Sequence, residues 1–139
     1  MKSYGGKLFE SIVEKDNFIV AQKLSRQGKS NRKEIKIFEA NLDKNLEEVR
    51  QLVIDKKFHT AKYRSKKIFE PKERIIYILP YAPDRIVQHA IMNILVPYME
   101  KMFITDSYAC ITGRGQTRAS LRTMQAVRRN KYCLKCDIH

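Results

Sequence analysis

Apolar residues recur at helical spacing in residues 1–57 and predict a helical first part of the chain. One helix should begin near Asn41 or Asp43, with an apolar face made of Leu42, Leu46, Val49 and Val53. An earlier helix is predicted from Asp16, which can serve as its N-cap, to the neighbourhood of Gly28. Residues 1–60 are therefore interpreted as a helical extension.

The period of the pattern changes after residue 60. The stretches "AKYRSKKIF" (61–69) and "RIIYILP" (74–80) flank the short polar stretch "EPKE" (70–73). Two strand-like runs joined by about four residues predict a β-hairpin. The second run is apolar on both faces, so we expect other elements to cover both of its sides.

Pro80 and Pro83 indicate a turn, after which Asp84 stands where a helix N-cap belongs. The helix that follows should end near Pro97. Its apolar stripe consists of Ile86, Val87, Ala90, Ile91, Ile94 and Leu95.

A loop is expected over residues 102–116, followed by a short helix over residues 117–129. In that helix Leu121 and Met124 should point inward and the arginines outward. The stretch "YCLKCDI" (132–138) is predicted to be a final strand. Helices mixed with a hairpin and a late strand give an α+β fold class.

Length and composition limit the functional classes. A chain of 139 residues forms one domain, or one domain with a small extension. It contains no run of apolar residues long enough to span a bilayer, so no membrane association is expected. Three cysteines, an odd number, argue against a disulfide framework and favour the reducing cytoplasm.

The charge balance changes this picture. The chain has 28 basic and 15 acidic residues, a net charge of +13. The basic residues gather over 23–36, over 56–74 and over 114–131. A solvated lysine-rich surface is one interpretation, and a polyanionic partner is the other, with nucleic acid ahead of anionic lipid. We hypothesise that the three basic segments line one groove.

Two places offer candidate chemistry. Lys67, Lys72 and Arg74 lie around the hairpin turn, where cations can grip a polyphosphate, although a solvated turn has the same composition. Asp137 lies at the end of the last predicted strand amid basic residues. A carboxylate there is either an ion-pair partner or a metal ligand.

The order of the motifs resembles the fingers and first palm segment of a reverse transcriptase, of the type found in diversity-generating retroelements and group II introns. The stretches that carry the resemblance are "FEPKERIIYILPYAPDRIVQHAIMNILVPYMEKMF", "DSYACITGRGQ" and "YCLKCDIH". The resemblance extends from about Tyr63 to His139. It implies an N-terminal extension at 1–60, a fingers region at 61–132 and the start of a palm at 133–139.

The resemblance also implies residue roles. Asp137 matches the first catalytic aspartate of the palm, which binds two magnesium ions with help from the carbonyl of Ile138. Lys72, Arg74 and Lys67 match residues that grip the triphosphate of the incoming nucleotide. The remaining matches are Tyr108 and Ala109 beneath the nucleotide, and Arg64, Arg85, Gln88, Arg114 and Arg118 along the nucleic acid.

Two positions depart from many members of this family. Ile111 stands where arginine often follows the Tyr-Ala-Cys sequence, and Thr117 stands near the place of a histidine. Both departures concern the contacts of that loop.

The resemblance implies an RNA-directed DNA polymerase whose partners are an RNA template, a DNA primer, deoxynucleoside triphosphates and Mg²⁺. The chain contains no Asp-Asp pair, so it resembles an N-terminal portion of such an enzyme and should be inactive by itself. Apolar surface left uncovered in such a portion can also favour a homodimer. A non-catalytic basic module that binds nucleic acid is the alternative. A basic domain for membrane surfaces ranks below both.

Overall fold

The computed structural model describes residues 5–69 and 71–137. The chain divides into two compact units, Met1–Pro97 and Tyr98–His139. The described residues form helices and one two-stranded antiparallel sheet, which confirms a mixed α+β class. The boundaries expected at residues 60 and 132 differ from this division and stay predictions.

The first unit begins with helices, as the apolar pattern predicts. They are α1 (Gly5–Ile12), α2 (Lys15–Ser25), α3 (Lys33–Glu39) and α4 (Leu42–Ile54). Helix α4 begins at Leu42, between Asn41 and Asp43, as expected. Helix α2 begins one residue before Asp16, with Glu14 at the N-cap position, so the predicted cap is wrong. Asp16 lies instead in the first turn, where its negative charge interacts favourably with the helix dipole.

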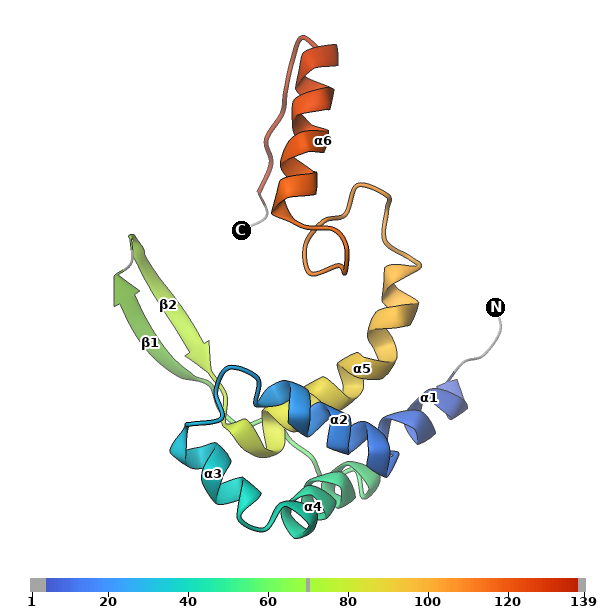
Figure 1. Cartoon of the computed structure of the whole chain (residues 1–139), viewed down its shortest axis with the longest axis vertical. Helices are drawn as coiled ribbons and strands as arrows, with labels where there is room; N and C mark the ends of the chain where they lie inside the picture. Colours follow the sequence, from blue (N-terminus) through green and yellow to red (C-terminus); the bar gives the residue numbers. More distant parts are fainter. Residues whose placement is uncertain (1–4, 70, 138–139) are drawn as a thin grey trace. The chain divides into compact units, whose positions relative to one another are not determined.

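Buried side chains of α2, α3 and α4 and of the beginning of α5 (Ile86–Glu100) form the core of the first unit. Figure 1 shows how these helices are arranged. Phe18, Ile35 and Ile86 lie at its centre and are almost entirely removed from solvent. The other buried apolar residues are Ala21, Phe38, Leu46, Val49, Tyr81, Val87 and Ala90. The burial of Ile86, Val87 and Ala90 confirms the inward face of the stripe predicted for this helix.

Asn17 connects three helices of the first unit through its side chain. Its Nδ2 donates hydrogen bonds of 2.9 Å to the carbonyls of Ile12 and Ala90. Its Oδ1 accepts a bond of 3.1 Å from Asn93 Nδ2. These bonds fix the position of α5 relative to α1 and α2.

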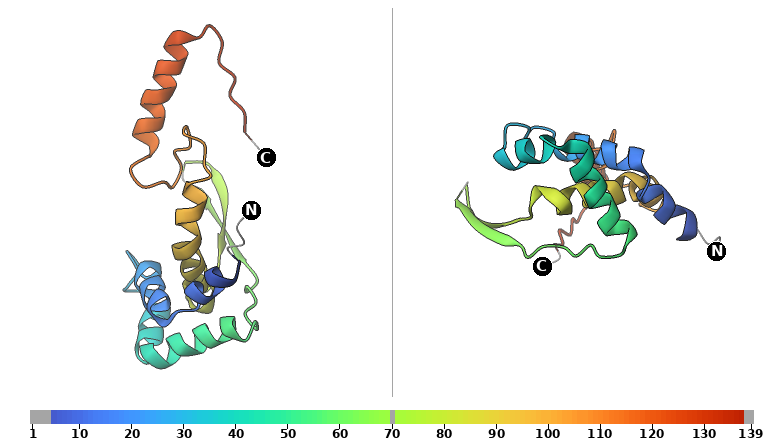
Figure 2. Two further views of the ribbon diagram at one scale, coloured as in Figure 1. Left: turned by 90° about the vertical axis from the view of Figure 1, so that its right-hand side faces the viewer. Right: turned by 90° about the horizontal axis from the view of Figure 1, so that it is seen from below.

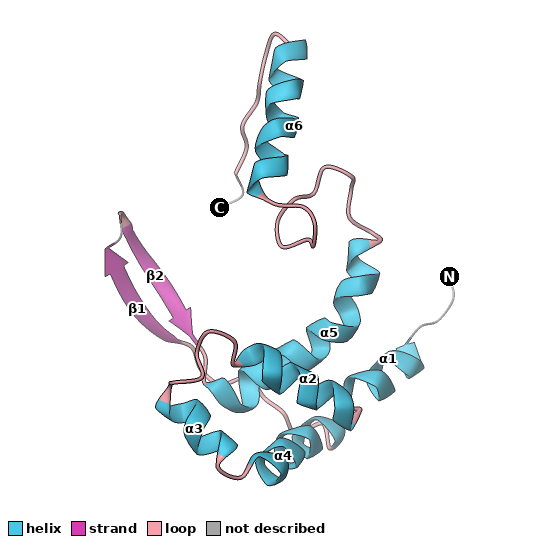
Figure 3. Cartoon of the chain, viewed as in Figure 1, coloured by secondary structure: helices cyan, strands magenta, loops and turns pink. Residues whose placement is uncertain are grey.

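The predicted hairpin is present. Strand β1 (Arg64–Phe69) pairs with β2 (Glu73–Ile78) in antiparallel register, with Arg64 opposite Ile78. The hairpin extends away from the helices of the first unit in the right-hand view of Figure 2, and Figure 3 shows its two strands in magenta.

The expectation that β2 is covered on both sides is wrong for the residues that the structure describes. Ile75 and Tyr77 are 52% and 66% exposed. A face of a sheet is buried only where another layer lies on it, and no described element covers this ribbon.

The segment between the hairpin and α5 is a tight turn, η1 (Tyr81–Arg85). Asp84 was expected to cap the next helix, and this is wrong. Its carboxylate is fully buried, and Oδ1 accepts a hydrogen bond of 2.9 Å from the backbone N–H of Ala61. Asp84 therefore holds the chain that leads into the hairpin. Helix α5 also continues through Pro97 to Glu100, beyond its predicted end.

The second unit contains a loop followed by α6 (Gln116–Arg129), close to the predicted bounds. Leu121 and Met124 do not point into a core, since they are 54% and 48% exposed and no described residue of this unit is buried. The strand predicted here is wrong for residues 132–137, because a strand needs a hydrogen-bonded partner and these residues pair with no described strand. Within the described ranges, no helix has the length and apolar character that a bilayer crossing requires.

Candidate functional site

The hairpin carries the cations that were predicted to grip a triphosphate. Lys72 lies in the connection, and Arg74 is exposed near the start of β2. Lys67 Nζ lies 2.6 Å from Glu73 Oε1 on the partner strand. This ion pair is exposed on both sides, so solvent screens it and it contributes little stability.

The register places these cations on different faces of the hairpin. Residues directly opposite one another share a face, and neighbours along a strand alternate. Arg74 lies opposite Ile68 and shares its face with Arg64, whereas Lys67 lies opposite Ile75 on the other face. The structure therefore groups Arg74 with Arg64 and separates both from Lys67.

A cavity of about 490 Å³ lies at the base of the hairpin, within the first unit. It is lined by side chains from distant parts of the sequence: Arg32 before α3, Tyr63 and Tyr77 on the hairpin, Arg85 in η1 and Gln88 in α5. Tyr63 and Tyr77 meet edge to face, with ring centroids 6.1 Å apart. The cavity thus combines two guanidinium groups, an amide and two aromatic rings.

Positive charges are crowded beside this cavity. The positive charge of Arg85 is the main cause that lowers the pKa of Lys29, followed by partial burial and by the charge of Arg32. Glu34 opposes the shift. Repulsion among cations on a folded surface is unfavourable, and an anion bound between them relieves it.

His89 belongs to the same positive environment. Desolvation lowers its pKa most, and the charges of Arg85 and Lys29 lower it further. The neutral imidazole is therefore favoured here.

In the second unit, two predicted nucleic-acid ligands bind the protein's own backbone. Arg114 Nη1 donates to the carbonyls of Thr105 at 2.8 Å, Ser107 at 3.1 Å and Ile104 at 3.4 Å. Arg118 Nη1 donates to the carbonyl of Gly113 at 2.7 Å. These arginines hold the loop between α5 and α6 in shape, because they bind several of its carbonyls at once. The carbonyl of Ile104 also accepts a hydrogen bond of 3.0 Å from the backbone N–H of Ser107.

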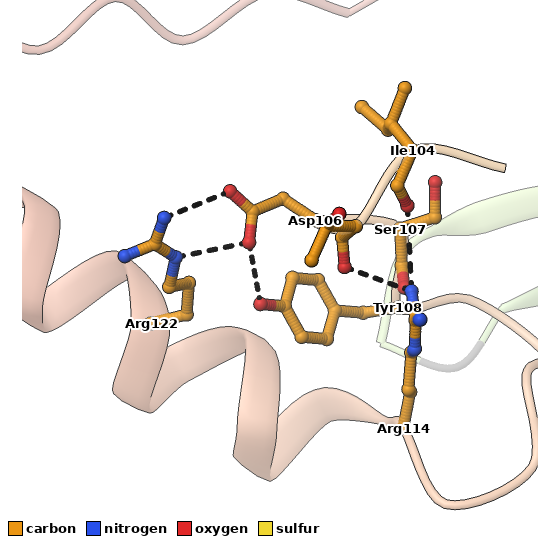
Figure 4. A network of polar contacts seen from close by, with 7 residues as sticks. Ile104, Asp106, Ser107, Tyr108, Arg114 and Arg122 are labelled. Atoms are coloured by element: carbon orange, nitrogen blue, oxygen red, sulfur yellow. Dashed lines mark hydrogen bonds and ion pairs between the residues drawn. The ribbon is translucent and has the colours of Figure 1, made fainter.

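Tyr108, predicted to lie beneath a nucleotide, is part of a polar network in the same unit (Figure 4). Its hydroxyl donates to Asp106 Oδ1 at 3.0 Å, and Arg122 contacts both carboxylate oxygens of Asp106, at 3.0 and 3.2 Å. The bond from Arg122 is the main cause that lowers the pKa of Asp106. Desolvation, then the bond to Asp106, raises the pKa of Tyr108. Ala109 follows Tyr108 and is exposed.

Asp137, the predicted metal ligand, is exposed, and Ile138 lies outside the described residues. Among residues 5–69 and 71–137, no three His, Cys, Asp or Glu side chains are grouped as metal ligands. A carboxylate is the right type of ligand for Mg²⁺, but one carboxylate does not make a complete site. The role of Asp137 as a magnesium ligand stays a prediction.

Sequence reasoning missed Lys29 and Arg32 as individual site residues. Both lie in the basic segment of residues 23–36, and the gathering of charge in that segment was the one signal in the sequence that could have indicated them. It could not show that Arg32 reaches the hairpin base, since this depends on how α3 packs against the turn η1. Tyr63 had a similar signal, as an aromatic residue among the basic residues of the second cluster.

The arrangement suits a phosphate-bearing ligand with flat aromatic groups, because arginine pairs with phosphate oxygens and tyrosine stacks on bases. Comparisons with models of protein families and with curated proteins find no match for this chain.

Proposed function

We propose that this chain is the fingers and first palm segment of a reverse transcriptase, an enzyme that copies RNA into DNA. The single observation that supports this best is the cationic cavity at the base of the hairpin. The order of the sequence motifs predicts a fingers hairpin. The cavity beside the hairpin offers guanidinium, amide and aromatic groups, which are the groups that contact a nucleic-acid strand.

In this proposal the cavity holds one part of the nucleic acid. Arg32 and Arg85 pair with phosphate oxygens, and Gln88 offers an amide to a base edge or a sugar. Tyr63 and Tyr77 provide faces on which an unpaired base can stack. The contacts to phosphate carry no sequence preference, as copying any template requires.

Lys72 and Arg74 then serve the triphosphate of the incoming nucleotide from the outer part of the hairpin. Lys67 takes a smaller part, because its charge is already balanced by Glu73 at 2.6 Å. A triphosphate reaching Lys67 has to compete with that carboxylate. We therefore expect alanine at Arg74 to raise the nucleotide requirement of the complete enzyme more than alanine at Lys67.

Asp137 is the proposed magnesium ligand. When bound, two ions activate the primer hydroxyl and stabilise the leaving pyrophosphate. Since the chain has no Asp-Asp pair, we expect no extension of a labelled primer when it is mixed with template, nucleotides and magnesium. Clear extension would overturn the assignment of Asp137 to an incomplete metal site.

The binding part is tested on the chain itself with a fluorescent RNA template annealed to a DNA primer. Replacing Arg32 and Arg85 by glutamine should weaken binding about tenfold or more, because two cations next to phosphate are lost. The matched control replaces Lys7 and Lys23, two exposed lysines of α1 and α2, by glutamine. Equal losses for both pairs would mean that net charge, and not the cavity, determines binding.

A non-catalytic nucleic-acid module is the second candidate. It is favoured by the lack of a grouped set of metal ligands in the described part of the chain. The two candidates differ in their response to nucleotides. For the enzyme portion, a matched deoxynucleoside triphosphate should protect Lys72 from chemical modification in the presence of primer and template. A module without that role gives no such protection.

A further inference from the structure

The first unit has a second hollow, an apolar groove between α3 and α4, which is separate from the cationic cavity. Its volume is about 500 Å³, and its floor is the turn from Pro80 to Pro83. The walls include Ile37 and Phe38 of α3 together with Val49 and Leu52 of α4. This is within the size range of sites that accept side chains or small ligands.

The groove is preformed. Asn45 Nδ2 donates a hydrogen bond of 2.8 Å to the carbonyl of Phe38, which ties α4 to α3 at one end. Tyr81, only 3% exposed, packs edge to face on Phe38 with ring centroids 5.6 Å apart. A ligand therefore meets walls that are already in place, which lowers the ordering cost of binding.

Apolar surface is left uncovered at this place. Ile37 is 63% exposed and Leu52 is 37% exposed. In addition, the buried hydroxyl of Tyr81 has no hydrogen-bond partner among the described residues. A floor that is well packed and walls that are half open distinguish this hollow from an ordinary packing defect of the core.

The charge around the groove has the opposite sign to that of the chain. Its charged lining residues are Glu34 and Glu48. From Glu34 to Asp55 the sequence has six acidic and three basic residues, although the whole chain carries a net charge of +13. Arg32 and Lys44 approach these carboxylates only at 3.8 and 3.9 Å, in exposed pairs. Such pairs are weak, so both carboxylates can accept another cation.

We propose that this groove is the docking site for a basic amphipathic helix of a partner protein. Apolar side chains of the helix, at positions i, i+3 or i+4, and i+7, would fill the space between Ile37 and Leu52. Arginine or lysine side chains beside them would pair with Glu34 and Glu48. Nucleic acid and anionic membranes do not suit this surface, because their phosphates are repelled by the two carboxylates.

The proposal does not depend on the reverse transcriptase assignment. In that assignment nucleic acid binds at Arg32 and Arg85, and neither residue lines the groove, although Arg32 approaches Glu34 at 3.8 Å. A failure of either proposal therefore leaves the other standing.

The test uses the whole chain and a fluorescent synthetic helical peptide as the probe. The peptide carries leucines at i, i+3 and i+7 and arginines on the flanks, and its binding is followed by fluorescence anisotropy. Glu48→Lys and Ile37→Asn should each lower the affinity about tenfold, the first by charge reversal and the second by an uncharged polar group on an apolar wall. Glu10→Lys, an equal charge change at an exposed site of α1, should leave it unchanged.

Two peptide controls separate charge from apolar contact. Exchanging the arginines for glutamates, or the leucines for alanines, should each abolish measurable binding. If the glutamate peptide binds as well as the arginine peptide, or if Glu10→Lys weakens binding as much as Glu48→Lys, the proposal is overturned.

A second copy of this chain is another occupant to exclude. Sedimentation of the chain without peptide should show no association that Ile37→Asn removes. A dimer that dissociates on this substitution would assign the groove to self-association and overturn the proposed partner. Circular dichroism of each variant checks that α3 and α4 remain folded.

Discussion

The two units of this chain are stabilised in different ways. In Met1–Pro97, apolar side chains of α2, α3, α4 and α5 are buried against one another. In Tyr98–His139, no described residue is buried, and the loop before α6 is held by Arg114, Asp106 and Arg122. The first unit owes its shape to the hydrophobic effect and the second to polar contacts that water can compete for.

The difference matters for function because the candidate residues are divided between the two units. One side of the cationic cavity, with Arg85 and Gln88, rests on the packed core, whereas Tyr63 and Tyr77 on its other side belong to the uncovered hairpin. Tyr108 of the second unit is positioned by exposed hydrogen bonds. We therefore expect substitutions to affect the two units very differently.

The largest effect is expected from Phe18→Ala. Phe18 is fully buried at the centre of the core, and its truncation removes transfer free energy and leaves a cavity. Urea unfolding should show a loss of about 3–5 kcal/mol. Val20→Ala, in the same helix at 47% exposure, should cost far less. Similar losses for both variants would show that this core does not stabilise the first unit.

A smaller effect is expected at Asp84. Asp84→Ala leaves the backbone N–H of Ala61 without its acceptor and should lower the free energy of unfolding by about 1–3 kcal/mol. Asp84→Asn retains an oxygen that can accept this bond, so its loss should be smaller. Thermal unfolding of the two variants makes the comparison, and equal losses would rule out the hydrogen bond as the main contribution.

In the second unit the expected effect is local. Asp106→Asn breaks the charge pairing with Arg122 while it preserves the size of the side chain. Amide hydrogen exchange of residues 104–108 should become faster, with little change in the unfolding midpoint of the chain. The control is Arg129→Gln, at the end of α6, the helix that carries Arg122. It should leave the exchange of residues 104–108 unchanged. A large shift of the midpoint would contradict the view that this network is local.

The smallest expected effect is a dependence of stability on pH through His89. Its folded pKa lies below that of the unfolded chain, so the unfolded state binds more protons. The contribution of His89 to the free energy of unfolding is therefore complete above about pH 6.5 and is lost as the pH falls through the folded pKa. His89→Asn should flatten the stability profile in this acidic range. If the pH dependence of stability stays unchanged in this variant, the charges of Arg85 and Lys29 do not affect His89 in the way proposed.

Much of the first unit could be predicted from the sequence, because its apolar period reflects real burial. Leu46 and Val49 of α4 are buried as their spacing indicates, and so are Ile86, Val87 and Ala90 of α5. The hairpin was also predicted correctly from its two strand-like runs. The cap at Asp84 was not, because a carboxylate before a helix can equally bind a distant backbone N–H, here that of Ala61.

The same patterns failed in the second unit, where apolar side chains have no described partner. Leu121 and Met124 were expected to point inward, and residues 132–137 were expected to form a strand. A periodic pattern states which face of an element can be buried, but burial and strand pairing need a second element. For the candidate site, the sequence indicated Arg85 and Gln88 through the resemblance, but no local pattern connected them to Arg32.

The function proposed above places nucleic acid at the cationic cavity between Arg32 and Arg85. Photocrosslinking can locate this contact, with an RNA template that carries 5-iodouridine in its unpaired part and is annealed to a DNA primer. We expect mass spectrometry to find the crosslink on Tyr63 or Tyr77, and we expect replacement of Arg32 and Arg85 by glutamine to remove it. Crosslinks confined to other tyrosines, such as the exposed Tyr132, would mean that nucleic acid does not bind at this cavity.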